Sequence, residues 1–177
     1  GSDSIAVLPI GRDGALGAYS TLTAVTAPLG PHRVEQKNVR PHHNPLDPQG
    51  RYFYLPCKGS DCVIGYRLDK RRGVLVEANR VAARPSAGPR HIDFHPTKAL
   101  AYVINELDST ITTYRQDRGS GELTPLQTMP ATPPDFTGYS TGAEIWVDRA
   151  GHNVYVSNRG HDSIAVFTID QATGMVT

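Results

Sequence analysis

Short runs of β-branched and aromatic residues, separated by turns, recur three times along the chain and constrain the fold more than any other feature. The second runs of the three units span 51–55, 101–105 and 154–157, and the third runs span 63–68, 111–114 and 164–169. Asp61, Asp108 and Asp162 precede the third runs, and Asp3 takes the same place near the N-terminus, at spacings of 58, 47 and 54 residues. Units of four strands that recur about every 40–50 residues are typical of β-propeller blades.

Asp61, Asp108 and Asp162 are predicted to cap their turns, because Asp side chains accept hydrogen bonds from nearby backbone N–H groups. One stretch also fits a helix: residues 97–118 contain no Gly or Pro. Their apolar side chains fall on one helical stripe, which comprises Leu100, Val103, Ile104, Leu107, Ile111 and Tyr114. The repeat favours strands, because the equivalent stretches 49–66 and 150–167 hold glycines at turn positions and are rich in β-branched and aromatic residues.

We therefore predict an all-β fold, a β-propeller of four-stranded antiparallel blades, with about three blades and part of another in this chain. The 177 residues would form a single partial domain, with a blade tail at 1–40 and blades at approximately 41–87, 88–140 and 141–177. In the tail, 3–16 predicts a strand and a turn, 21–26 a second strand, and 28–40 a polar loop. Known propellers close with about four to eight blades. We expect either a fragment of a larger propeller or self-association of two copies that closes the ring.

Charge and composition exclude several classes of partner. The formal net charge is +1, which gives no general attraction to nucleic acid or to a membrane surface. No apolar run approaches the roughly 18 residues of a membrane span, and no signal peptide is visible. Cys57 and Cys62 flank a turn and could face each other; we read them as reduced, with a structural disulfide as the less favoured alternative. This predicts a cytoplasmic location.

Charged residues recur at equivalent strand ends. The first strands begin with His42, Arg90 and Ala143, followed by His43, His91 and Glu144, and the second strands end with Lys58, Glu106 and Arg159. First strands line the channel of a propeller, so these side chains would meet at its mouth. Charges at strand ends are often only solvated, and an Arg–Glu pair can be purely structural. The recurrence in three units favours a functional site, whereas His95, His152 and His161 lie in turns and are expected at the surface.

Several catalytic classes lack their motifs. The chain has no Gly-rich phosphate loop, no G-x-S-x-G elbow and no H-E-x-x-H motif. These absences point away from an NTPase, a serine hydrolase and a zinc protease. We expect a site without metal or cofactor, in which Arg binds an anion and His or Glu transfers a proton.

Four motifs resemble the lactonase family of seven-bladed propellers. They are Gly-Pro-Arg-His-x-x-Phe-His-Pro at 88–96, Tyr-Val-Ile-Asn-Glu-Leu at 102–107, Ala-Glu-Ile-x-Val at 143–147, and Val-Tyr-Val-Ser-Asn-Arg-Gly-His-Asp-Ser-Ile-Ala-Val-Phe at 154–167. The family includes the cofactor-independent bacterial 6-phosphogluconolactonase and the fungal carboxy-muconate lactonizing enzyme. Because its members are longer, the resemblance implies further blades. It also implies the catalytic residues, which match His42, Arg90, Glu106 and Arg159.

The resemblance implies hydrolysis of a sugar-acid lactone, with 6-phosphogluconolactone as the first candidate. Arg90 and Arg159 would bind the phosphate or carboxylate of the small anionic substrate, and Glu106 or His42 would act as general base. If Arg90 lowers the pKa of Glu106, His42 becomes the better base. His43 stands where several relatives carry a small polar residue, which leaves open which histidine acts. Reversible lactonization of a muconate and a non-catalytic binding platform stay as alternatives.

Overall fold

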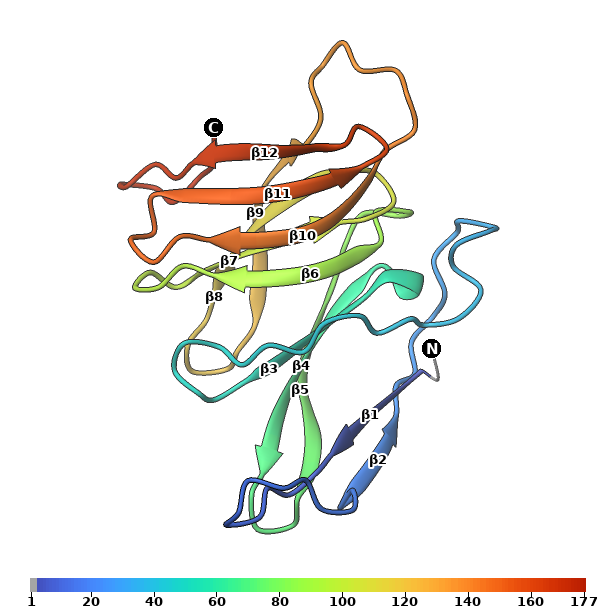
Figure 1. Cartoon of the computed structure of the whole chain (residues 1–177), viewed down its shortest axis with the longest axis vertical. Helices are drawn as coiled ribbons and strands as arrows, with labels where there is room; N and C mark the ends of the chain where they lie inside the picture. Colours follow the sequence, from blue (N-terminus) through green and yellow to red (C-terminus); the bar gives the residue numbers. More distant parts are fainter. Residues whose placement is uncertain (1–2) are drawn as a thin grey trace.

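Residues 3–177 form four antiparallel sheets that succeed one another as blades of a partial propeller (Figure 1). The computed structural model describes residues 3–177, so residues 1–2 of the predicted blade tail lie outside it. The first two sheets contain β1 (Ser4–Val7) and β2 (Thr21–Ala24), then β3 (Phe53–Cys57), β4 (Cys62–Asp69) and β5 (Val74–Ala82). The third contains β6 (Pro89–Phe94), β7 (Leu100–Asn105), β8 (Thr110–Gln116) and β9 (Leu123–Pro130). The fourth contains β10 (Thr141–Val147), β11 (Asn153–Arg159) and β12 (Ser163–Thr168).

This architecture confirms the predicted all-β propeller and excludes a helix at 97–118. Every residue of β7 is buried, because the blade packs against a neighbouring sheet on each side. A strand buried on both faces carries a continuous apolar run, which explains why its sequence also fits a helical stripe. Between residues 3 and 177, no helix is long and apolar enough to cross a membrane.

Three apolar cores lie between successive sheets. The first, between the β1–β2 sheet and the β3–β5 sheet, comprises Val25, Val39, Leu55, Cys57, Cys62, Ile64 and Tyr66. The second, between the β3–β5 and β6–β9 sheets, is built around Tyr54, Val63, Ile92, Phe94 and Val103. The third, between the β6–β9 and β10–β12 sheets, includes Tyr102, Ile104, Ile145, Val154 and Val156. The inner strands are therefore held in a fixed order around the channel.

The inner segment of the second sheet is less regular than β6 and β10. Residues 41–46 pair with β3 through only two isolated bridges, Pro41 with Cys57 and Leu46 with Phe53. Pro41 and Pro45 have no N–H to donate, so a regular ladder is impossible there. The predicted strand at 21–26 is present as β2, and no helix or strand forms between residues 28 and 40.

Each repeated turn before a third strand contains one residue with a positive φ angle, and Asp108 caps its turn as predicted by accepting a hydrogen bond from the Thr110 hydroxyl at 2.7 Å. Asp3, Asp61 and Asp162 adopt positive φ angles of 33°, 45° and 53°, and Ser109, not Asp108, does so in the third sheet, at 48°. Asp162 accepts a hydrogen bond from the N–H of Gly160 at 3.0 Å and so caps its own turn, as expected.

Asp61 has another role, so the prediction that it caps its own turn is wrong. Its carboxylate accepts hydrogen bonds from the N–H groups of Ser86 (2.7 Å) and Gly88 (2.8 Å), which lead into β6. Asp3 acts in the same way on the N–H groups of Val39 and Arg40, at 3.1 and 2.9 Å. Each aspartate therefore fastens one sheet to the beginning of the next inner segment.

The prediction that the turn histidines lie at the surface holds for His152 but is wrong for His95, which is 2% exposed. Nδ1 of His95 accepts hydrogen bonds from the N–H groups of Thr97 (3.2 Å) and Lys98 (3.0 Å), which fixes the turn between β6 and β7. Gly151 of the next sheet approaches so closely that a Cβ there would lie 2.5 Å from His95 Nε2. His161 is half-buried and its ring contacts Phe136 edge-on.

The link that Asp61 makes between the second sheet and the start of β6 can be tested by Asp61→Ala. Loss of the carboxylate leaves the N–H of Gly88 buried without its acceptor, which costs about 1–3 kcal/mol of the free energy of unfolding. Urea unfolding of the variant, with Asp135→Ala at an exposed position as control, measures this. Equal stabilities of the two variants would contradict the tie.

Candidate active site

The predicted site residues gather where the inner segments begin and the second strands end. The pairs that define this end are Pro41 with Cys57, Pro89 with Asn105, and Thr141 with Arg159. Register shifts interrupt β6 after Pro89 and β10 after Gly142, so Arg90 and Glu144 lie in bulges. A bulge changes the direction of a side chain without ending the strand. The two bulges allow Arg90 and Glu144 to reach across to neighbouring segments.

Glu106, just after β7, is the centre of the charged groups. Its side chain contacts three cations: Oε1 lies 2.6 Å from Lys58 Nζ and 3.2 Å from Arg159 Nη2, and Oε2 lies 2.9 Å from Arg90 Nε. The Arg90 contact is a charge pair outside hydrogen-bond geometry, whereas the Lys58 contact is a hydrogen bond. Glu106 is 8% exposed and Lys58 7%. The structure thus brings three of the four predicted residues, Arg90, Glu106 and Arg159, into direct contact.

The cations determine the charge of Glu106. Burial alone would raise its pKa, but the hydrogen bond and charge of Lys58, with the charges of Arg159 and Arg90, outweigh burial and lower it. We expected Arg90 to lower this pKa; Lys58 has the larger effect. Glu106 is therefore a carboxylate at neutral pH and a weak base.

Lys58 and Glu35 complete the cluster. Lys58 was predicted at the channel mouth but not among the four catalytic residues, and Glu35 was not predicted. Lys58 opens the short 3₁₀ helix Lys58–Ser60, and its Nζ also lies 3.0 Å from Glu35 Oε2. Glu35 in turn pairs with Arg40 at 2.9 Å. The position of Lys58, equivalent to Glu106 and Arg159 in the repeat, was a usable signal for it. Glu35 lies in a loop without periodicity, and no sequence pattern indicated it.

The guanidinium of Arg90 is mostly buried and contacts protein groups instead of solvent. Its Nη1 donates to the carbonyl of Ala143 at 2.7 Å and lies 3.1 Å from Nε2 of His91. Arg159 differs, because its side chain is 52% exposed. Of the two predicted anion-binding arginines, Arg159 is the one open to a ligand, and Arg90 orients its neighbours.

His42, the fourth predicted residue, joins the cluster through another histidine. Its Nδ1 lies 3.2 Å from Nε2 of His91, and Nδ1 of His91 lies 2.7 Å from Glu144 Oε1. Burial and, next, the charge of Arg90 lower the pKa of His42, so its ring is neutral at pH 7. The pKa of His43 is lowered to about 4, chiefly by burial. His43 Nδ1 accepts from the N–H of Ile92 at 3.3 Å, which leaves His42 as the better placed of the two.

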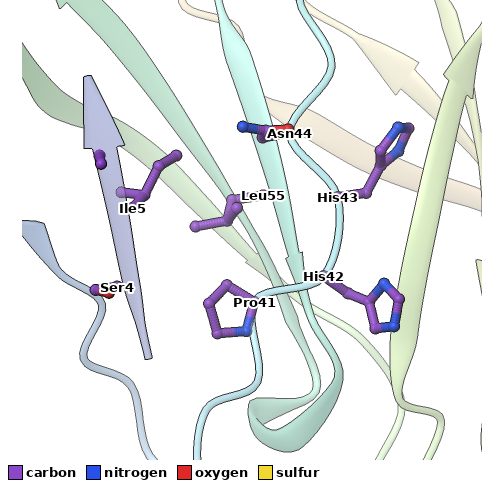
Figure 2. A pocket seen from close by; sticks show the side chains of 8 residues that line it. Ser4, Ile5, Pro41, His42, His43, Asn44 and Leu55 are labelled. Carbon is purple, nitrogen blue, oxygen red and sulfur yellow. The ribbon is translucent and has the colours of Figure 1, made fainter. Parts of the chain in front are cut away.

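Two hollows adjoin His42. One of about 260 Å³ lies between β1 and residues 41–44 (Figure 2), but the rings of His42 and His43 point away from it, toward β6. The other, of about 340 Å³, is lined by Arg40, Pro41, His42 and Lys58 and lies on the side of the charged cluster. The second hollow is the candidate substrate pocket, because the ionisable side chains line it.

The charges of this site favour an anionic ligand. Four cations, Arg40, Lys58, Arg90 and Arg159, pair directly with two carboxylates, Glu35 and Glu106, and a third carboxylate, Glu144, joins the cluster through His91. An excess of positive charge in a partly enclosed pocket attracts anions. Within residues 3–177, no group of three or more His, Cys, Asp or Glu side chains is arranged to hold a metal ion.

The fold and the charged channel mouth define a class: β-propellers with a cluster of ion-paired side chains at one end of the inner strands. The chain belongs to the lactonase family of seven-bladed β-propellers, which matches residues 1–177. The 6-phosphogluconolactonase of Bacillus subtilis is 38% identical over 173 residues, which cover 98% of this chain and 48% of the relative. The 6-phosphogluconolactonase of Pectobacterium carotovorum is 30% identical, over 98% of this chain and 49% of its own.

Solved structures agree with this assignment. A protein from Lactobacillus plantarum aligns with a TM-score of 0.92 at 32% identity, over 99% of this chain and 50% of its own. The periplasmic gluconolactonase of Pseudomonas aeruginosa aligns with a TM-score of 0.89 at 28% identity, over 98% of this chain and 48% of its own. This chain spans about half the length of the curated relatives it matches.

Glu106→Gln tests the charge cluster. Without the carboxylate the buried cations lose their counter-charge, and breaking a buried pair costs about 3–5 kcal/mol. Because folding lowers the pKa of Glu106, its stabilisation is complete above the unfolded pKa of about 4.3 and disappears as pH falls through the lower folded value.

The measurement is the free energy of unfolding from pH 7 down to pH 3, compared with Glu122→Gln at an exposed position. The gap between wild type and Glu106→Gln should narrow as the pH falls. A gap that is constant over this range, or absent at pH 7, would contradict the charge assignment.

Proposed function

We propose that this site hydrolyses the lactone of an anionic sugar acid, with 6-phosphogluconolactone as the first candidate, and without a cofactor. The observation that carries the proposal is the arrangement of a neutral His42 beside a cluster whose cations outnumber its carboxylates. Lactone hydrolysis needs a base that takes a proton from water, which a neutral His42 can supply, and positive charge that stabilises an oxyanion, which the cations supply. The names of the curated relatives support this choice of substrate.

His42 is the proposed general base, and the reaction is balanced in protons. Water adds to the lactone carbonyl carbon and gives one proton to the ring of His42, which forms a tetrahedral oxyanion. The oxyanion collapses, the ring C–O bond breaks, and the leaving oxygen takes the proton back from His42. The product is the open-chain hydroxy acid. Glu106 is the poorer base because it is ion-paired and its pKa is lowered.

The cations divide the remaining work. Arg159 is exposed, so it can bind the developing oxyanion or the phosphate of the substrate. Lys58 and Arg40 line the pocket and attract the anionic end of the substrate. Glu106 keeps Lys58, Arg90 and Arg159 close together, and Arg90 orients His91.

Two further proposals concern the whole protein. The outer face of β12 leaves Ile164 and Val166 exposed, whereas the equivalent strands β4 and β8 are buried between sheets. We place further blades, or a second copy that closes the ring, against this face. The cytoplasm is the proposed location, since Cys57 and Cys62 lie directly opposite each other as free thiols.

The first test is hydrolysis of 6-phosphogluconolactone above the spontaneous rate by wild type and by Arg90→Lys. Lysine cannot reproduce the contacts of the guanidinium with Ala143 and Glu106, so activity should fall, by about tenfold or more. Arg115→Lys, at an exposed position on β8, is the matched control. Wild-type hydrolysis no faster than background would reject this substrate, and unchanged kinetics in Arg90→Lys would reject the role of Arg90.

The second test is the pH dependence of kcat/KM. A neutral base is required, so the rate should be lost as pH falls through the pKa of His42, which lies below its ordinary value of about 6.5. His42→Gln should lower kcat by about 10²–10⁴-fold and remove this limb. His152→Gln, in an exposed turn, should change neither. If kcat/KM of His42→Gln still falls toward acid pH in the same way, the general base is another residue.

A further inference from the structure

Two channel-mouth residues that are not among the four predicted catalytic residues, Glu144 and His91, form a series of hydrogen bonds that ends on His42. Glu144 Oε1 lies 2.7 Å from Nδ1 of His91, and Nε2 of His91 lies 3.2 Å from Nδ1 of His42. We infer that Glu144 and His91 are positioning residues that hold His42 in the tautomer with its proton on Nδ1 and its lone pair on Nε2. This inference deepens the proposed function, because it names the nitrogen that would take the proton from water.

Arg90 determines which nitrogen of His91 donates and which accepts in this series of hydrogen bonds. A guanidinium has only donors, so its Nη1, 3.1 Å from Nε2 of His91, must donate to that nitrogen. Nε2 of His91 is therefore an acceptor, and the ring carries its proton on Nδ1. That proton faces the carboxylate of Glu144, which can only accept. A proton on Nε2 of His91 would face an N–H of Arg90 and is disfavoured.

The same rule then fixes His42. Nε2 of His91 has one lone pair, which Arg90 Nη1 and His42 Nδ1 share, so the contact with His42 is a hydrogen bond only if His42 donates from Nδ1. A neutral imidazole has one donor and one acceptor nitrogen, so Nε2 of His42 carries the lone pair. Nε2 is then the nitrogen that can accept a proton from water, and His42 lines the pocket together with Arg40 and Lys58.

The ring of His91 is held in place on each side. It stacks on His43 with ring centroids 4.4 Å apart and an angle of 23°. His43 itself accepts from the backbone N–H of Ile92, and Glu144 Oε1 also accepts from the N–H of Ile145 at 2.9 Å. Backbone N–H groups of β6 and β10 therefore hold His43 and Glu144 in place, and these two side chains in turn fix the ring of His91.

The protonated nitrogen can be read directly by ¹⁵N NMR of the imidazole groups at neutral pH. In wild type we expect Nδ1 of His42 to show the shift of a protonated nitrogen and Nε2 that of an unprotonated one. In His91→Phe, which keeps the stacked ring but removes both nitrogens, the proton should redistribute toward Nε2. A proton on Nε2 of His42 in wild type, or no change in His91→Phe, overturns the inference.

Kinetics give a second readout. Both His91→Phe and Glu144→Ala should lower kcat at least about tenfold with little change in KM, because the base is misoriented while substrate contacts remain. Glu122→Ala, also an exposed glutamate, should leave kcat unchanged. If His91→Phe fails to fold, Glu144→Ala carries both readouts, since its side chain is 58% exposed and its loss leaves no cavity.

The outcomes separate this inference from the proposed function. Wild type with the expected tautomer but no lactone hydrolysis would keep the series of hydrogen bonds to His42 and reject the function. Hydrolysis with the opposite tautomer would reject that series and keep the function.

Discussion

The contact of Glu106 with Lys58, Arg90 and Arg159 is the interaction on which the site depends. Removing charged groups from water is unfavourable, and a buried carboxylate is stable only when cations and hydrogen bonds surround it. The cations come from three successive sheets, so no single blade could bury Glu106. The charged cluster therefore forms only when the blades are packed in order, and the apolar cores between them are a condition for the proposed activity.

The propeller supplies this arrangement because equivalent strand ends meet at one place. Lys58, Glu106 and Arg159 follow or end the second strands of three blades, and radial packing brings them to the same end of the channel. Bulges in β6 and β10 then turn Arg90 and Glu144 toward the neighbouring segments that they contact. Repetition sets the position of each group, and local irregularity sets its direction.

The contrast between repeated strand positions and local irregularities explains which features the sequence could predict. Strand type, sheet order and the strand-end charges depend on periodic features, and so the contacts of Glu106 with Arg90 and with Arg159 could be predicted. Lys58 was visible in the same register but had no motif to distinguish it. Glu35 and the tie made by Asp61 depend on how an irregular loop returns to a neighbouring blade, and no periodicity records that path. The buried state of His95 was missed because its turn packs against Gly151 of the next sheet.

The least regular inner segment carries the proposed base, and this has a physical consequence. Residues 41–46 are anchored by two bridges and interrupted by prolines, so backbone pairing alone fixes the ring of His42 poorly. The backbone N–H of His42 bonds to the carbonyl of Pro56 at 3.0 Å, which fixes its Cα, but the ring is oriented by His91. The accuracy of the base therefore depends on side chains of the two following blades. The orientation of the proposed base therefore depends on the packing of those blades. A substitution that loosens the channel mouth should lower the proposed activity even where the free energy of unfolding changes little.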